Sequence, residues 1–216
     1  MGSLLSQVLP LAAGAAVSPA VLTLQLLVLA RGSGAVRRSW FIAAGAAAVL
    51  AVEAALALSL AEGTGGPGTP PDWRSAVKLA AAVALLLMGI RNLVRKPAPK
   101  KDEREGGIGP GRAFGLGVIL MVTNVTTLAL YFPLVHEIST DDASLTAKVV
   151  VFALASLIVM VPAAGPPLVV TVLGDRADAG LKRMNTFVTA HHQTISAAVC
   201  FLFALVLGIP ALRNLL

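Results

Sequence analysis

Val17-Ser18-Pro19-Ala20 lies near the middle of an apolar stretch that runs from Leu4 to Ala30. A proline inside a helix removes one backbone hydrogen bond and clashes with the preceding turn. In hydrocarbon, the carbonyl group that loses its partner must find another one, and Ser18, Thr23 and Gln25 are nearby candidates. The stretch therefore predicts either a simple kink or a broken helix whose exposed backbone binds a substrate near the membrane midplane.

The rest of the chain has the same apolar character. Its 216 residues are 56% hydrophobic and only 13% charged, whereas a soluble domain carries roughly 25% charged residues. The charges gather in short runs between long apolar stretches, which is typical of a polytopic membrane protein. The net charge of +6 comes from these connections. The positive-inside bias explains such loops, so we expect membrane lipids and no nucleic acid as partners.

About six stretches are long enough to cross a membrane, since a helical span needs about 20 apolar residues. They are Leu4–Ala30, Trp40–Ala61, Ser75–Val94, Ala113–Val135, Ala147–Leu173 and Thr194–Leu212. The prolines predict that the first and fifth spans are broken, and the polar centre of the fourth makes it a further candidate. Residues 175–193 are too polar to span, and their apolar residues recur at helical spacing. They predict an amphipathic helix on the cytoplasmic interface.

The charges of the connections predict the orientation. The first, third and fifth connections are basic, from Arg31 to Arg38, from Arg91 to Arg112 and from Arg176 to Arg183. The second has little charge, and the fourth contains Glu137, Asp141 and Asp142. The positive-inside rule then places the odd connections in the cytoplasm and both termini outside the plasma membrane.

This pattern divides the chain into two three-helix halves. Residues 1–94 form the first half, 95–112 a basic cytoplasmic linker, and 113–216 the second half with the interfacial helix at 175–193. An odd number of spans in each half gives the halves opposite orientations. The expected fold class is therefore an all-α membrane protein with two inverted repeats of three helices.

A polar cluster at the centre of the fourth span matches the interruption in the first. Hydrogen bonding between helices and a polar site on an internal cavity both explain such a cluster. We expect the second, with substrate bound where the two interruptions face each other. The expected substrate-binding residues are Ser18, Pro19, Thr23, Gln25, Thr123, Asn124, Thr126 and Thr127.

Three further groups are candidates for function. Glu53 lies inside the second span, and Lys78 enters the third from the same side, so they predict a proton or cation coupling site or a structural ion pair. In the fifth span, prolines and a glycine predict a hinge or a static re-entrant break; these residues are Pro162, Gly165, Pro166 and Pro167. The expected contacts to anionic headgroups are Arg176, Lys182 and Arg183.

Soluble-type catalysis is not expected. The sequence contains no recognisable set of nucleophile, base and acid, and its single cysteine, Cys200, excludes a thiol–disulfide carrier. His191 and His192 are adjacent but have no further ligands nearby in sequence, so we expect a solvated pair and no metal site. The chain is thus predicted to be neither an enzyme nor a binder of cofactors.

Several segments resemble one family. The opening from Val8 to Pro19, the basic Pro-containing linker, and the run from Leu181 through Ile195 toward Gly208 are similar to the GAP family. Those are the glycolipid- or sulfolipid-addressing proteins of actinobacteria, within the lysine-exporter (LysE) superfamily. That superfamily often has Asn-Pro-Lys in the fourth span, whereas this chain has Asn124-Val125-Thr126. Only the asparagine is kept, which weighs against an ion or amino-acid site of the superfamily type.

The resemblance implies movement of an envelope glycolipid or its precursor outward across the plasma membrane. Such an amphipathic lipid would be the substrate, and a larger lipid exporter or a second copy of the chain would be a protein partner. Two alternatives stay open. One is a LysE-type exporter of a small polar solute, either an amino acid or a cation. The other is a non-transporting partner of a larger lipid exporter.

Overall fold

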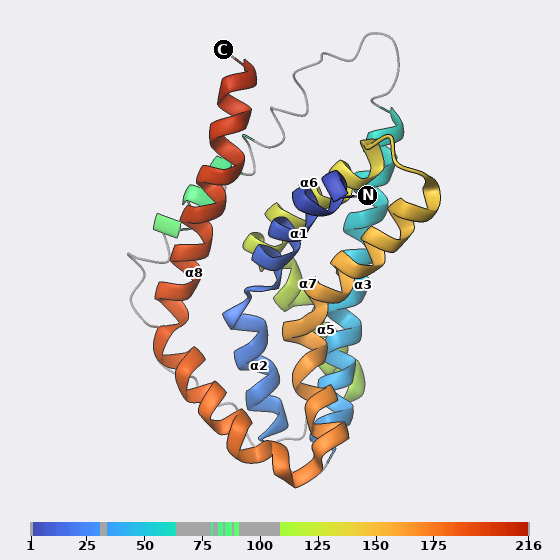
Figure 1. The fold of residues 1–216 in the computed structure, drawn as a ribbon. Coiled ribbons are helices and arrows are strands. Elements are labelled where there is room, and N and C mark those ends of the chain that lie inside the picture. Colours follow the sequence, from blue (N-terminus) through green and yellow to red (C-terminus); the bar gives the residue numbers. More distant parts are fainter. Residues whose placement is uncertain are drawn as a thin grey trace.

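The protein is an all-α membrane protein with several spans. A computed structural model describes residues 2–30, 34–63, 79, 82–83, 85–87, 89–90 and 109–215. Every element in these ranges is helical (Figure 1). The elements are α1 (Gly2–Ala16), α2 (Pro19–Leu29), α3 (Ala35–Gly63), α5 (Pro110–Val122), α6 (Val125–Thr140), α7 (Leu145–Leu173), the 3-10 helix η1 (Gly174–Ala177) and α8 (Asp178–Leu215). The expected third span, 75–94, lies largely outside the described residues.

Two of the expected interruptions are present. α1 and α2 meet at a bend of 49°, and α5 and α6 at a bend of 74°. Each bent pair is long and apolar enough to count as one broken span, while α3 and α7 pass the same test as single helices. The first span is therefore broken at Val17 and Ser18, and the fourth at Thr123 and Asn124.

The expected break in the fifth span is wrong. α7 is one uninterrupted helix that contains Pro162, Pro166 and Pro167, and Gly165 is helical as well. A proline removes a hydrogen-bond donor, yet its fixed φ of about −65° is compatible with a helix. The three prolines are buried in the bundle. Packing and a hydrogen bond from Gln25 to the carbonyl of Ala163 keep this segment helical. The segment is therefore not an unwound hinge.

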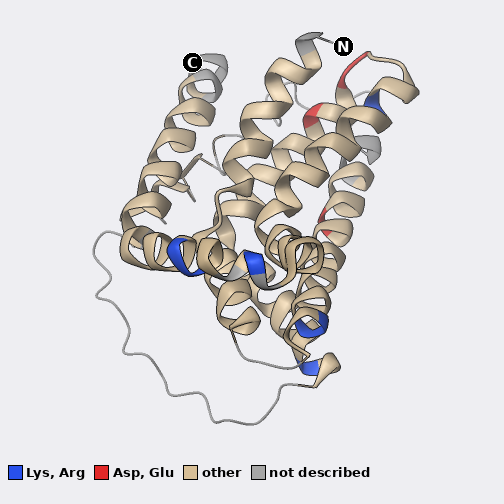
Figure 2. Ribbon diagram, turned by 60° about the horizontal axis from the view of Figure 1, so that its bottom comes forward, with Lys and Arg blue, Asp and Glu red and all other residues tan. Residues whose placement is uncertain are grey.

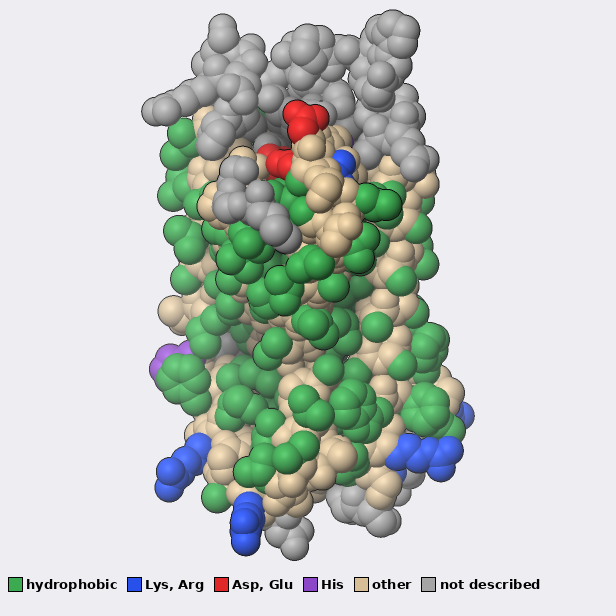
Figure 3. All heavy atoms as spheres, turned by 45° about the vertical axis from the view of Figure 1, so that its right-hand side comes forward, with side chains coloured by type: hydrophobic (Ala, Val, Ile, Leu, Met, Phe, Trp, Pro, Cys, Tyr) green, Lys and Arg blue, Asp and Glu red, His purple; other side chains and the backbone are tan. Residues whose placement is uncertain are grey.

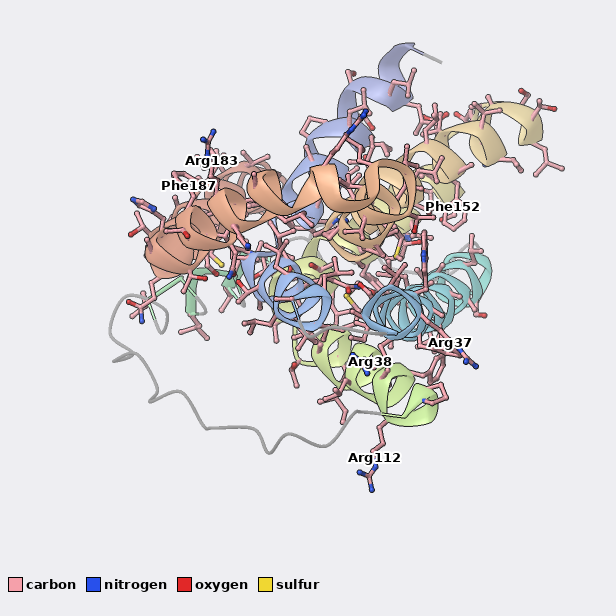
Figure 4. All side chains as sticks on the ribbon, turned by 90° about the horizontal axis from the view of Figure 1, so that it is seen from below. Arg37, Arg38, Arg112, Phe152, Arg183 and Phe187 are labelled. Atoms are coloured by element: carbon pink, nitrogen blue, oxygen red, sulfur yellow. The ribbon has the colours of Figure 1, made fainter. Side chains whose placement is uncertain are left out.

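The predicted interfacial helix and last span belong to one long helix with a bend. In α8, residues Ala179–His191 and Gln193–Ile209 meet at 67°. Seen from below, the first of these segments lies across the end of the bundle (Figure 4). This arrangement agrees with an amphipathic segment that precedes a final span.

The two ends of the bundle differ in charge. α1 begins and α8 ends at the same end of the molecule (Figure 1). The acidic residues around the α6–α7 connection share that end, whereas the arginines of α3 and α5 and the basic residues of α8 lie at the opposite end (Figure 2). The pattern is the one that the positive-inside rule predicts when both termini lie outside. The orientation itself stays a prediction.

Between the two ends, hydrophobic side chains cover much of the face seen in Figure 3. Large side chains such as Ile119, Leu157 and Val172 are 62%, 68% and 73% exposed. So much exposed apolar surface is unfavourable in water, whereas the acyl chains of a membrane solvate it. Inside, α6 packs against α7, where the buried Tyr131 hydroxyl lies 3.2 Å from Ser156 Oγ.

The same order of elements occurs twice. A broken span is followed by a long helix in each half, as α1–α2 then α3, and as α5–α6 then α7. α1–α2 run toward the basic end, whereas α5–α6 run away from it (Figure 1). Opposite directions are what an inverted repeat requires. A repeat relationship between the halves stays a prediction.

Candidate functional site

The interruption between α1 and α2 is stabilised from the other half of the chain. Pro19 has no N–H group, so the carbonyl of Ala15, four residues earlier, loses its helical partner. Thr127 Oγ1 of α6 donates a hydrogen bond to that carbonyl at 3.0 Å. Ser18 and Thr127 are 6% and 1% exposed, so the bond forms inside the bundle. The sequence placed the partner of this carbonyl on Ser18, Thr23 or Gln25, and the structure places it on Thr127.

The second interruption touches the first directly. Asn124 directly precedes α6, and its Nδ2 donates to Ser18 Oγ at 2.7 Å and to Thr127 Oγ1 at 2.8 Å. One amide therefore joins both breaks into a single hydrogen-bonded network. The prediction that these two polar interruptions face each other at the same depth agrees with this geometry.

Gln25 forms a separate buried network. Pro167 has no N–H group, so the carbonyl of Ala163 loses its partner in α7. Gln25 Nε2 donates to that carbonyl at 2.6 Å and to the carbonyl of Ser39 at 3.2 Å. Ser39 Oγ in turn donates to Gln25 Oε1. Gln25 is completely buried, and these bonds use both donor hydrogens of its amide group and one acceptor site of Oε1. This network compensates for a proline that the sequence suggested would break the helix.

We call the point where Ser18, Asn124 and Thr127 bond one another the crossing. The remaining predicted binding residues are distributed around it. Thr126 Oγ1 lies 3.4 Å from Cys200 Sγ, which links α6 to α8. Thr123 is exposed, and its hydroxyl donates to the carbonyl of Ile119 in its own helix at 2.8 Å. Pro19 is buried, and Thr23 Oγ1 is a buried atom without a hydrogen-bond partner among the described residues. The crossing thus contains Ser18, Asn124 and Thr127, while Thr123 and Gln25 lie outside it.

Glu53 lies on the flank of the bundle and not in the central network. It is half-buried on α3, where it lines a groove beside α5 and α6. Its carboxyl interacts with the backbone of Phe132, but Oε2 has no hydrogen-bond partner among the described residues. The expected partner, Lys78, lies outside the described residues, so the predicted pair is not tested.

The basic end presents separate arginines around its rim. Figure 4 shows Arg37, Arg112 and Arg183 pointing outward from α3, α5 and α8. The three expected headgroup contacts, Arg176, Lys182 and Arg183, are exposed in η1 and the first part of α8. Contact of these three side chains with anionic headgroups stays a prediction.

Among the described residues, two buried polar side chains were not predicted as candidates. Ser39 is fully buried and completes the Gln25 network. His136 is 2% exposed on α6, close to the acidic end. The signal for His136 was available, because an ionisable residue at the edge of a predicted span is a functional candidate. Ser39 gave no signal, since its partner is 14 residues away along the chain.

The chain matches one known protein family over most of its length. Residues 8–212 match the family described as Sap, sulfolipid-1-addressing protein. This match includes both interruptions, the Gln25 network, Glu53 and the basic segment of α8. No curated protein and no solved structure matches the chain. The wider placement in the lysine-exporter superfamily stays a prediction.

Proposed function

The chain belongs to the sulfolipid-1-addressing protein family, and we propose that it is a transporter that moves an anionic envelope glycolipid outward across the plasma membrane. Family membership connects it with lipid transport. The direction, the carrier mechanism and the plasma membrane are our proposal.

The proposal depends above all on the crossing of two broken helices. Ser18 and Asn124 lie 106 residues apart along the chain and are joined by a 2.7 Å hydrogen bond. Broken helices near the midplane are typical of secondary transporters, where they expose backbone to a substrate when the halves move. Because few bonds connect the two breaks, a relative movement of the halves exposes several polar groups together.

The apolar flank favours a lipid over a small polar solute. The groove beside Glu53 is lined almost entirely by apolar side chains, and the central polar groups bind one another. An amino acid or a cation needs a polar or charged cavity for its desolvation. An acyl chain needs none, so a lipid suits this surface better.

The charge distribution favours an anionic headgroup. Exposed basic side chains ring one end of the bundle (Figure 4), and a basic surface at the cytoplasmic leaflet attracts negatively charged lipids. A sulfolipid headgroup is anionic. The basic end would therefore collect the substrate on the side from which it is exported.

A leaflet assay with purified protein tests this function. A fluorescent sulfated glycolipid is placed in both leaflets of proteoliposomes, and dithionite then bleaches only the outer leaflet. Transport carries inner-leaflet lipid outward, so we expect bleaching to continue beyond the outer-leaflet fraction. Asn124→Leu should change this rate, whereas Thr123→Val, which alters a bond within one helix, should not.

The alternatives predict other results. Movement of a labelled amino acid or cation in place of the glycolipid would support a solute exporter. If protein-containing and protein-free liposomes bleach equally, the chain does not transport alone. A role as the partner of a larger lipid exporter would then explain family membership better.

A further inference from the structure

Gln25 and Tyr131 occupy matching positions in the two broken spans. Gln25 is the seventh residue after Ser18, and Tyr131 is the seventh residue after Asn124. Each therefore lies about two helical turns beyond its interruption. Both side chains are buried, with exposed fractions of 0% and 1%. α2 runs from the crossing toward the basic end and α6 runs away from that end (Figure 1), so the two residues lie on opposite sides of the crossing.

The helices that carry these residues have matching neighbours. α2 and α6 each pack against both long helices, α3 and α7. Gln25 bonds Ser39 of α3 and the carbonyl of Ala163 of α7, and we call these three residues the basic-side tie. Tyr131 Oη lies 3.2 Å from Ser156 Oγ of α7, and we call this pair the acidic-side tie. One buried side chain thus connects each of the two helices to a long helix of the bundle.

The interruptions are positions at which α2 and α6 can turn relative to the rest of their spans. α2 meets α1 at a bend of 49°, and α6 meets α5 at a bend of 74°. Residues at the ends of helices act as hinges, because they absorb changes of φ and ψ without breaking a helix. In hydrocarbon, little water is available to replace a broken hydrogen bond. Each tie therefore holds its helix against such a movement.

We propose that the two ties are the gates of the transport cycle, with Gln25 and Tyr131 as the gating residues. This inference rests on the proposed function. Separation of α2 from α3 and α7 breaks the basic-side tie and exposes the crossing toward the basic end. Separation of α6 from α7 breaks the acidic-side tie and exposes the crossing toward the acidic end. Both ties are formed in this structure, which corresponds to the occluded state of the cycle.

Thiol accessibility from each side of the membrane tests the gates. Cys200 is the single cysteine of the chain, and it is fully buried, with its Sγ 3.4 Å from Thr126 Oγ1 beside the crossing. A charged methanethiosulfonate reagent that does not cross the bilayer reaches this thiol only when water does. The reagent is added to right-side-out and to inverted membrane vesicles. Asp142→Cys and Arg183→Cys, each combined with Cys200→Ala, show which end faces the reagent, because these exposed positions lie at opposite ends (Figures 2 and 4).

Each tie can be loosened by the removal of one hydroxyl group. Tyr131→Phe removes the acidic-side bond and keeps the ring, whereas Ser39→Ala removes the bond to Gln25 Oε1. We expect Tyr131→Phe to raise the rate of Cys200 labelling from the acidic end about fivefold, as the loss of one hydrogen bond implies. Ser39→Ala should raise this rate by a similar factor from the basic end. Neither variant should change the rate from the other end.

A control and a second reporter separate gating from a merely structural role. Ser59→Ala removes a hydroxyl that bonds the carbonyl of Ala55 in its own helix, and it should change neither rate. Ser18→Cys combined with Cys200→Ala places the reporter thiol at the crossing itself. If the ties were only structural, each variant would raise labelling from both ends. An equal rise from both ends, or no rise at either reporter, would overturn the inference.

The leaflet assay for glycolipid, applied to the wild-type protein, separates this inference from the proposed function. Glycolipid movement by a protein whose variants show no side-selective labelling overturns the gates and leaves the function. Side-selective labelling in a protein that moves no glycolipid overturns the function, and the ties then control the passage of another substrate.

Discussion

Asn124 Nδ2 donates a 2.7 Å hydrogen bond to Ser18 Oγ, and this bond joins the interruption of one broken span to the interruption of the other. The same amide nitrogen contacts Thr127 Oγ1 at 2.8 Å, and Thr127 bonds the carbonyl that Pro19 leaves without a partner. Polar side chains at the second interruption thus form hydrogen bonds with Ser18 and with the carbonyl that Pro19 leaves free at the first.

Removing this amide should weaken the contact between the halves. Asn124→Leu deletes both donated bonds, and hydrogen bonds between membrane helices are each worth about 0.6–2 kcal/mol. We expect a lower unfolding temperature in detergent, measured by tryptophan fluorescence. Thr123→Val is the matched control, since the Thr123 hydroxyl donates to carbonyls of α5, Ile119 and Leu120, and to no other described residue. Equal destabilisation by both variants would show that the bond between the breaks has no special role.

The partnership of Gln25 with the proline segment can be tested by a double substitution. Gln25→Leu leaves the buried carbonyl of Ala163 without its 2.6 Å bond, and such a loss costs about 1–3 kcal/mol. Pro167→Ala restores an N–H group four residues after Ala163. We therefore expect Pro167→Ala to recover part of the stability that Gln25→Leu removes. Strictly additive effects in the cycle would contradict the partnership.

The glycine contact between α3 and α5 should tolerate no side chain. Gly117→Ala places a Cβ against the backbone of Ile42, and overpacking of this kind costs about 1–3 kcal/mol. Gly115→Ala is two residues away in the same helix and meets no atom within 4 Å. Thermal unfolding in detergent should therefore separate the two variants. A Gly117→Ala protein as stable as Gly115→Ala would mean that α3 and α5 lie farther apart.

The basic residues of α8 should bind anionic lipid. Replacing Lys182 and Arg183 by glutamine removes two exposed charges, and each is worth about 1 kcal/mol at an anionic surface. We expect weaker retention of a fluorescent anionic phospholipid by the protein in nanodiscs, with the difference shrinking as salt is added. Lys148→Gln is the control, because Lys148 Nζ bonds the carbonyl of Ser139 at the opposite end. An equal effect of the control would point to net charge alone.

The apolar stretches, the polar interruptions and the charge of each connection can be read from the sequence. The third predicted span lies largely outside the described residues and stays a prediction. These features depend on local composition, since a span needs a certain length of apolar residues and a proline always removes its own donor. For the same reason the breaks at Ser18 and Asn124 were predicted, and so was the amphipathic segment before the last span. The sequence also indicated the family, because the family's short motifs are patterns of neighbouring residues that can be recognised without a structure.

Only the tertiary structure decided which freed carbonyl each side chain satisfies. Gln25 reaches Ala163, 138 residues away along the chain, and therefore α7 remains helical where the prolines alone predicted a break. The groove beside Glu53 is likewise lined by residues of α3, α5 and α6, which only the fold brings together. A proline's local effect is fixed by its own chemistry, but its consequence depends on a donor that the fold brings from elsewhere.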